Sequence, residues 1–115
     1  MKKFVALYLA PASAIAQMKE QMKALTPEQM KAGMDMSMNW AKQHEKSILE
    51  LGAPLGKTMK VTAQGASDSK NEVTGYSVVQ ADSHAAAAKM FEGHPHFRMP
   101  GGSVEVMEVM PIPGM

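Results

Sequence analysis

Histidine is the side chain best suited to acid–base chemistry near neutral pH, and this sequence contains four of them. His94 and His96 flank Pro95, which stiffens the backbone and so limits the freedom of both imidazoles. His44 lies far from this pair in the sequence, and its neutral imidazole could act as a general base. Arg98 follows the pair and could hold a carboxylate or phosphate of a ligand. The alternative is structural, with hydrogen-bonded or solvated histidines and a solvated surface arginine.

Two kinds of metal site can be considered. His94 and His96 supply two ligands, whereas a metal site needs three or four with defined geometry. The run MDMSM at residues 34–38 carries three thioethers, which are ligands for Cu(I) in oxidising compartments. On a helix, however, Met36 would point about 160–200° away from the other two methionines. We therefore expect no metal and no cofactor, with the methionines as adaptable core residues. A periplasmic methionine-rich copper binder stays as an alternative.

Aromatic residues complete the set of candidates. Tyr8 and Tyr76 lie in predicted strands and offer hydroxyls to a pocket or a partner. Trp40 lies about 100° from the centre of the apolar face of a predicted helix, where it lines a pocket mouth or packs against a neighbour. Gly101 and Gly102 are not a phosphate loop, because no nucleotide-binding pattern surrounds them and a strand follows. The predicted ligand-binding residues are Tyr8, Trp40, His44, His94, His96 and Arg98, and no catalytic residue is assigned.

Composition excludes several functions. Twelve basic residues nearly balance eleven acidic ones without a basic patch, so we expect no nucleic-acid partner. The absence of cysteine excludes thiol nucleophiles, disulfides and thiolate metal sites. No apolar run approaches the ~20 residues that span a bilayer, so we expect no membrane association. At 115 residues the chain is expected to form one domain, residues 1–115.

The opening stretch MKKFVALYLAPASAIA admits two interpretations. Two lysines, an apolar segment and an Ala-x-Ala sequence are typical of a secretory signal peptide. The apolar segment, residues 4–10, is however at the minimum length for one, and it also alternates as a strand with apolar residues on both faces. We expect a strand, and with it a cytoplasmic protein.

The remaining elements follow from periodicity and caps. Thr26, Pro27 and Gln29 form a capping-box pattern at the start of a long helix that is predicted to run to about Leu51 and stop at Gly52. Met30, Met34, Ala41 and Ile48 are expected to form its apolar face. The other predicted elements are a helix at 13–25, a strand at 57–63, a polar loop at 64–71, a strand at 73–81, a helix from Asp82 or Ser83 to Gly93, an irregular loop, and a strand at 103–110.

This order is β-α-β-β-α-β, which predicts an α+β, ferredoxin-like fold with an antiparallel sheet. The helices can cover only one face of the sheet. The first and third predicted strands carry apolar residues on both faces, so the second face would be left open to solvent. We therefore expect a homodimer formed sheet against sheet.

Three segments carry a resemblance to a known family. They are LGAPLG (51–56), NEVTGYSVVQADSHAAAAKMFEGHPHF (71–97) and GGSVEVMEVMPIPGM (101–115). Through them the chain resembles the YCII-related proteins, including the DGPF-like branch. The resemblance implies a dimeric α+β barrel, usually cytosolic. It also implies a His–Asp pair beside the sheet and, in one branch, a dechlorinating lyase-type activity. The family histidine lies early on the long helix, where residues 34–38 carry Asp35 but no histidine.

Three functional hypotheses follow. The first is a YCII-like dimeric barrel that binds a small organic molecule between sheet and helices, with lyase-type or acid–base activity as an open question. The second is a non-catalytic regulatory or oligomerisation module. The third is the periplasmic copper binder. A cleft containing His44, Tyr8 or His96 would favour the first hypothesis, and a filled core would favour the second.

Overall fold

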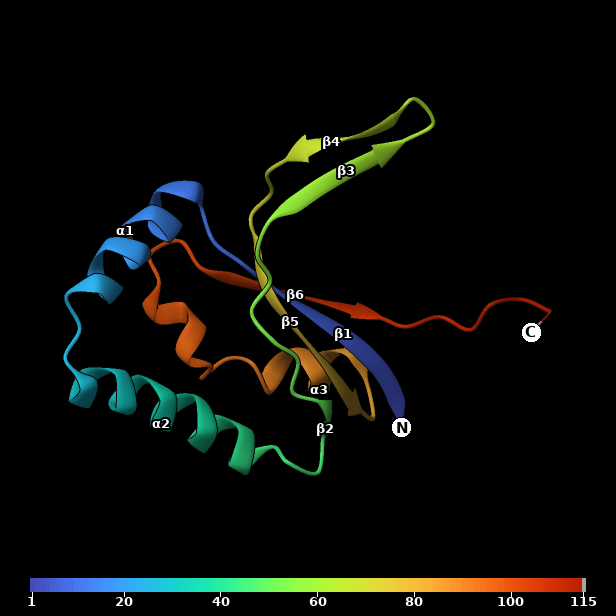
Figure 1. Cartoon of the computed structure of the whole chain (residues 1–115). Coiled ribbons are helices and arrows are strands. Elements are labelled where there is room, and N and C mark those ends of the chain that lie inside the picture. The colour runs from blue at the N-terminus through green and yellow to red at the C-terminus, as the bar shows by residue number, and fades with distance from the viewer. Residues whose placement is uncertain (115) are drawn as a thin grey trace.

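The computed structural model describes residues 1–114 and is built on a four-stranded sheet with the order β2-β5-β1-β6 (Figure 1). Its strands are β1 (Lys2–Leu9), β2 (Ile48–Glu50), β5 (Val73–Ala81) and β6 (Ser103–Glu108). Every neighbouring pair is antiparallel. Helices α1 (Ala12–Lys23) and α2 (Pro27–Gln43) connect β1 to β2, and α3 (His84–Lys89) connects β5 to β6. The α+β, ferredoxin-like prediction is confirmed.

The opening stretch of the sequence forms a central strand of this sheet. β1 pairs with β5 on one side and with β6 on the other. Phe4 and Ala6 are fully buried, and Ser77 and Val79 of β5 are buried beside them. The alternation of side chains in the sequence therefore indicated a strand correctly, and one face of β1 forms the centre of the core.

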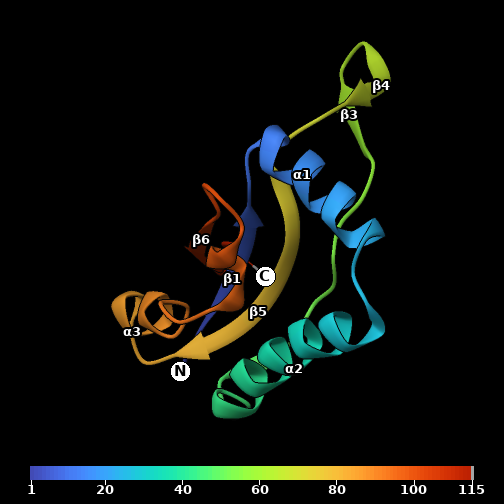
Figure 2. The same ribbon diagram turned by 90° about the vertical axis from the view of Figure 1, so that its left-hand side faces the viewer.

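Helices α2 and α3 lie over one face of the sheet (Figure 2), whereas Ala14 is the one buried residue of α1. Ala87 of α3 and Phe91 just after it pack on the core residues of β1 and β5, and α2 adds Trp40. The opposite face carries Val5, Leu7, Tyr76, Val78 and Met107, which are paired across strands β1, β5 and β6, with the exposed Glu105 opposite Leu7. No helix among residues 1–114 is both long and apolar enough to cross a membrane.

Helix α2 begins as predicted but differs in its end and in its buried face. Thr26 Oγ1 accepts a hydrogen bond from the Gln29 amide at 3.1 Å, and the Gln29 side chain accepts one from the Thr26 amide at 2.9 Å, which completes the capping box. Met34 is 68% exposed, whereas Trp40 is only 4% exposed. The predicted apolar face is therefore correct for Ala41 and Ile48, which pack against the core, and wrong for Met30 and Met34, because α2 meets the core at its C-terminal end.

The prediction of helix as far as Leu51 was also wrong. Helix α2 ends at Gln43, and residues 48–50 form the edge strand β2, which pairs with β5. Backbone groups on the free edge of β5 satisfy this segment better than further helical turns would. Gly52 has φ +81°, and a Cβ at this position would lie 1.7 Å from the Tyr76 carbonyl oxygen. Glycine is therefore required for close approach to β5, and it does not act as a helix stop.

Residues 57–71 differ from the prediction as well. The expected strand is β3 (Thr58–Thr62), but it pairs with β4 (Gly65–Ser69) in a separate two-stranded sheet. β4 had been predicted as part of a polar loop. Because β2 already occupies the edge of β5, this segment forms a hairpin that projects away from the main sheet (Figure 1).

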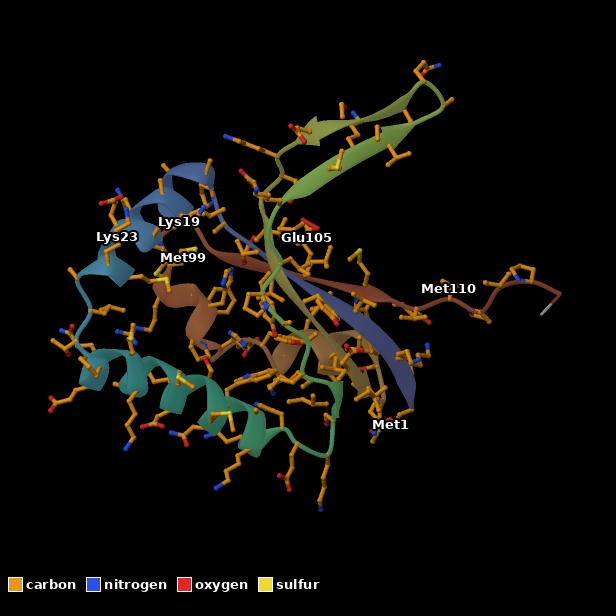
Figure 3. All side chains as sticks on the ribbon, in the orientation of Figure 1. Met1, Lys19, Lys23, Met99, Glu105 and Met110 are labelled. Carbon is orange, nitrogen blue, oxygen red and sulfur yellow. The ribbon has the colours of Figure 1, made fainter. Side chains whose placement is uncertain are left out.

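The C-terminal third contains shorter elements than predicted. Ser83 caps α3 by accepting a hydrogen bond from the Ala86 amide at 3.1 Å, as expected. The loop that follows contains a 3₁₀ helix, η1 (Pro95–Arg98), and β6 ends at Glu108. Residues 110–114 extend away from the body, with Met110 exposed (Figure 3).

Candidate ligand-binding site

Five aromatic rings meet on the helix-covered face of the sheet. Tyr8 comes from β1, Trp40 and His44 from the end of α2, and Phe91 and His94 from the segment after α3. The ring centroid of His94 lies 4.8 Å from that of Tyr8 and 4.5 Å from that of Trp40. Trp40 also lies 5.2 Å from both Phe91 and His44. We call these five residues the His94 cluster.

The local backbone fixes the tautomer of His94. Nδ1 of His94 accepts a hydrogen bond from the backbone amide of His96 at 2.9 Å, so the proton of the neutral ring lies on Nε2. Burial, followed by the nearby imidazoles of His96 and His44, lowers the pKa of His94 to about 4. At neutral pH, His94 is therefore an uncharged donor through Nε2–H.

The Nε2–H group of His94 is accessible. Among residues 1–114 this group has no hydrogen-bond partner. Every fully buried side-chain nitrogen or oxygen in that range does have one. The Nε2 atom must therefore reach solvent. A neutral donor on a half-buried ring, surrounded by other rings, is suited to an uncharged oxygen acceptor of a ligand.

His96 holds the loop against β1. Its Nε2–H donates to the Leu9 carbonyl at 2.7 Å, and its ring lies 5.5 Å from Tyr8. The chain then turns back so closely that a Cβ on Gly102 would lie 2.9 Å from the His96 carbonyl oxygen. His96 therefore anchors the loop that carries His94, and Gly102 permits the turn.

Tyr8 belongs to a chain of hydrogen bonds. Ser77, which is 1% exposed, donates to the Leu51 carbonyl at 2.7 Å, so its oxygen is free to accept from the Tyr8 hydroxyl, also at 2.7 Å. Burial raises the pKa of Tyr8, partly offset by this hydrogen bond to Ser77. The phenol is therefore neutral at pH 7, and its oxygen keeps lone pairs that can accept a hydrogen bond from a ligand.

Trp40 forms the base of the cluster. Its Nε1–H donates to the Met90 carbonyl at 2.9 Å, which joins α2 to the end of α3. His44 is the C-cap of α2 and lies beside the indole, partly exposed. The sequence placed His44 at the border of a continuing helix, whereas the structure places it at the end of one.

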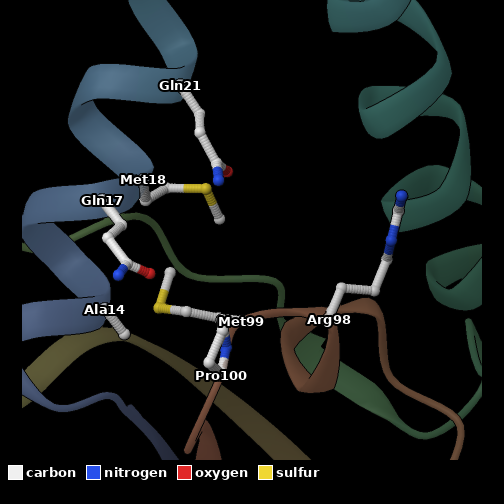
Figure 4. Close-up of a pocket in the computed structure, with 7 residues that line it drawn as sticks. All are labelled: Ala14, Gln17, Met18, Gln21, Arg98, Met99 and Pro100. Atoms are coloured by element: carbon white, nitrogen blue, oxygen red, sulfur yellow. The ribbon is translucent and has the colours of Figure 1, made fainter.

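Arg98 does not join the cluster. Its Nη1 donates to the Met36 sulfur at 2.8 Å, and its side chain extends toward α2 across a small hollow (Figure 4). This hollow of about 30 Å³ is lined by Ala14, Gln17, Met18, Gln21, Arg98, Met99 and Pro100. A second, open groove of about 370 Å³ runs along the base of the β3–β4 hairpin. Neither space is lined by Tyr8, His44 or His96.

The residues considered as metal ligands can be located too. Among residues 1–114 no three His, Cys, Asp or Glu side chains are grouped as a metal ion would require. The 34–38 methionines lie on α2, so the helical geometry that separates Met36 from its neighbours is confirmed. The absence of metal and cofactor stays a prediction.

Sequence reasoning missed two members of this region. Ser77 is a polar residue on the buried face of β5, between Gly75 and Val79, and that position was the signal that could have revealed it. Phe91 had been placed in a longer helix, whereas α3 ends at Lys89. The other predicted residues, except Arg98, are brought together as described above.

Comparison with known proteins assigns the chain to no family. No family model and no curated protein matches the chain. Among solved structures, it is similar to 5-chloro-2-hydroxyhydroquinone dehydrochlorinase from Burkholderia phenoliruptrix, determined in complex with 2,5-dihydroxybenzoquinone. The two share 13% identity over 96% of this chain and 94% of that one, with a TM-score of 0.48.

Proposed function

We propose that this protein binds a small, uncharged organic molecule at the His94 cluster. The observation that carries the proposal is the accessible Nε2–H of a neutral His94, packed between Tyr8 and Trp40. The rings provide apolar contact for a planar molecule, and His94 and Tyr8 provide one donor and one acceptor. An anionic ligand is less suited, because Arg98 is turned toward Met36.

The same geometry limits the chemistry that the site could perform. Nδ1 of His94 is occupied by the His96 amide, and a pKa of about 4 makes the ring a weak base. His94 would therefore polarise a carbonyl by hydrogen bonding, as an uncharged imidazole can. A general base for lyase-type or acid–base activity would have to be His44, whose ring lies beside the same indole, 5.2 Å from Trp40.

Native mass spectrometry of protein purified without added ligand tests this proposal. We expect a retained small molecule that carries a carbonyl or hydroxyl oxygen. Replacing His94 with Asn keeps an acceptor for the His96 amide but removes the Nε2–H donor. Affinity for the retained molecule should fall roughly three- to tenfold, as expected for one neutral hydrogen bond. The matched control is His84→Asn, since His84 packs on Phe4 and donates to Val106. Equal affinity in both variants would contradict the proposal.

We also propose that the protein is a homodimer. The chain exposes 8532 Å², whereas a folded monomer of 12.4 kDa exposes about 6,100 Å². Two copies would thus have an excess of about 4,800 Å², within the ~2,000–5,000 Å² buried by obligate homodimers. The radius of gyration, 16.1 Å, likewise exceeds the ~13 Å of a globular chain of this length. The face that carries Leu7 and Val78 is the surface proposed to meet its copy.

Sedimentation of the purified protein tests the dimer. We expect twice the chain mass at micromolar concentration, and monomeric or insoluble protein for Leu7→Lys, because the introduced charge would be buried between two sheets. Met38→Lys is the matched control, since Met38 is exposed on α2, and it should stay dimeric. A stable wild-type monomer with this face open to solvent would refute the dimer.

Cytoplasmic location and YCII-related membership are part of the same proposal. Cleavage after Ala14 would remove β1 and with it Phe4 and Ala6 from the core. Intact mass from the native host should therefore include residues 2–16. Loss of that segment would overturn the location and require a different sheet.

A second candidate is a non-catalytic oligomerisation module. It is favoured by the packing of the cluster rings against one another and by the position of both hollows elsewhere. The mass-spectrometric experiment separates the two candidates, because this module would retain no small molecule and His94→Asn would change only stability.

A further inference from the structure

The β3–β4 hairpin is an arm that the rest of the chain does not support. Its strands pair from Thr58 with Ser69 to Thr62 with Gly65, and they form a sheet separate from the main one. In Figure 1 the arm extends to the side opposite α1 and α2. A two-stranded hairpin by itself is only marginally stable in water, so an ordered arm needs a surface to pack against.

One face of this arm is mainly apolar and carries Met59, Val61 and Ala66, with the exposed Asp68 opposite Met59. Met59 and Val61 point to the same side of β3, and Ala66 is the cross-strand partner of Val61. Met59 is 61% exposed and Val61 is 76% exposed. The other face carries Thr58, Lys60 and Thr62, with Ser67 and Ser69 opposite. Such a two-sided hairpin is built to cover an apolar surface with one face and meet water with the other.

We propose that this arm packs its Met59–Val61–Ala66 face on a second copy of the chain. The inference rests on the homodimer proposed above. It goes further, because it assigns the arm to the partner's surface in addition to the sheet-to-sheet contact. Three observations identify the occupant. Helices α2 and α3 lie on the other face of the sheet from the proposed contact, the arm projects away from α1 and α2 in Figure 1, and the exposed Met59 and Val61 contribute to the area in excess of a globular monomer.

Hydrogen exchange and dimer dissociation test the arm separately from the dimer. In wild-type protein, the amides of residues 58–69 that pair in the hairpin should exchange at least tenfold more slowly than in the monomeric Leu7→Lys variant. Val61→Asp should raise the dimer dissociation constant at least tenfold. The matched control is Thr62→Asp on the opposite face of the same strand, which should leave it unchanged.

The outcomes distinguish the two proposals. A wild-type monomer would overturn both of them. The arm proposal alone would be overturned if the wild-type protein is a dimer with unprotected hairpin amides and the Val61→Asp and Thr62→Asp variants have equal dissociation constants. Hairpin protection that persists in a soluble Leu7→Lys monomer would also overturn it, since the arm would then be stable without a partner. Val61 is mostly exposed in one chain, so far-ultraviolet circular dichroism of the monomeric fraction should be unchanged.

Discussion

The pKa of His94 links the candidate site to stability. The pKa of His94 is about 4 in the folded protein, against 6.5 for an ordinary histidine. Between pH 4 and pH 6.5 the folded protein therefore binds fewer protons than the unfolded chain. Its favourable contribution is therefore fully present above pH 6.5 and is lost as the pH falls toward 4. Between pH 7 and pH 5 the full shift would remove about 2 kcal/mol, and solvent screening of this half-buried ring reduces that to about 1 kcal/mol.

Urea unfolding at pH 7 and pH 5, followed by fluorescence, measures this loss. Trp40 is the only tryptophan in the sequence and contacts His94, so it reports on the cluster directly. Other groups titrate over the same pH range, so the loss of unfolding free energy is compared between wild type and variants, all at one protein concentration. His94→Asn should lose about 1 kcal/mol less than wild type over this interval.

Tyr8→Phe is the matched control, because it changes the same cluster but leaves His94 titratable. It should keep the wild-type pH dependence while being less stable at both values. Nuclear magnetic resonance of the histidine rings gives a direct check. A His94 that titrates near 6.5, or equal pH dependence in wild type and His94→Asn, would show that the ring is not held neutral by burial.

Three further predictions concern other parts of the molecule. Gly52→Ala should destabilise the fold by at least about 2 kcal/mol, because its Cβ would meet the Tyr76 carbonyl at 1.7 Å, and amide exchange should be fastest in β2. Ser77→Ala should cost about 1–3 kcal/mol, and Tyr8→Phe combined with it should cost less than the sum in a double-mutant cycle, since both remove one shared hydrogen bond. Elemental analysis should find no stoichiometric zinc, copper or iron, whether or not His94 is replaced by Ala. One metal per subunit that disappears in His94→Ala would establish a metal site instead.

The sequence was informative wherever local chemistry decides the structure. The capping box at Thr26 and the serine cap at Ser83 depend on residues within one helical turn, and both formed as predicted. The alternation in residues 4–10 likewise identified a strand that is covered on its helix side. Four of the six predicted site residues, Tyr8, Trp40, His44 and His94, proved to be neighbours, and His96 anchors the same loop to β1.

The errors arose where tertiary contacts outweigh local pattern. Residues 48–50 continue the helical periodicity of α2, but the free edge of β5 draws them into β2. Trp40 is offset from the methionine stripe, and α2 meets the core at its C-terminal end, through Trp40 and Ala41, so Met30 and Met34 earlier in the helix stay exposed. Arg98 was grouped with the histidines by sequence distance alone, whereas the 3₁₀ turn that contains it directs the side chain to Met36.

The donor geometry of His94 is set by the backbone before any ligand arrives. Pro95 fixes the first residue of η1, His94 caps that helix through Nδ1, and His96 ties the loop to Leu9. The tautomer of His94 is thus imposed by the main-chain amide of His96, and the contacts of residues 94–96 hold this amide in place. Because neither the loop nor the proton has to rearrange, a ligand that accepts from Nε2–H loses less free energy to ordering the site. From the sequence, the stiffness of the His94–Pro95–His96 turn indicates only that both imidazoles have limited freedom. In the structure, the same stiffness is the feature that would make a single neutral hydrogen bond effective in recognition.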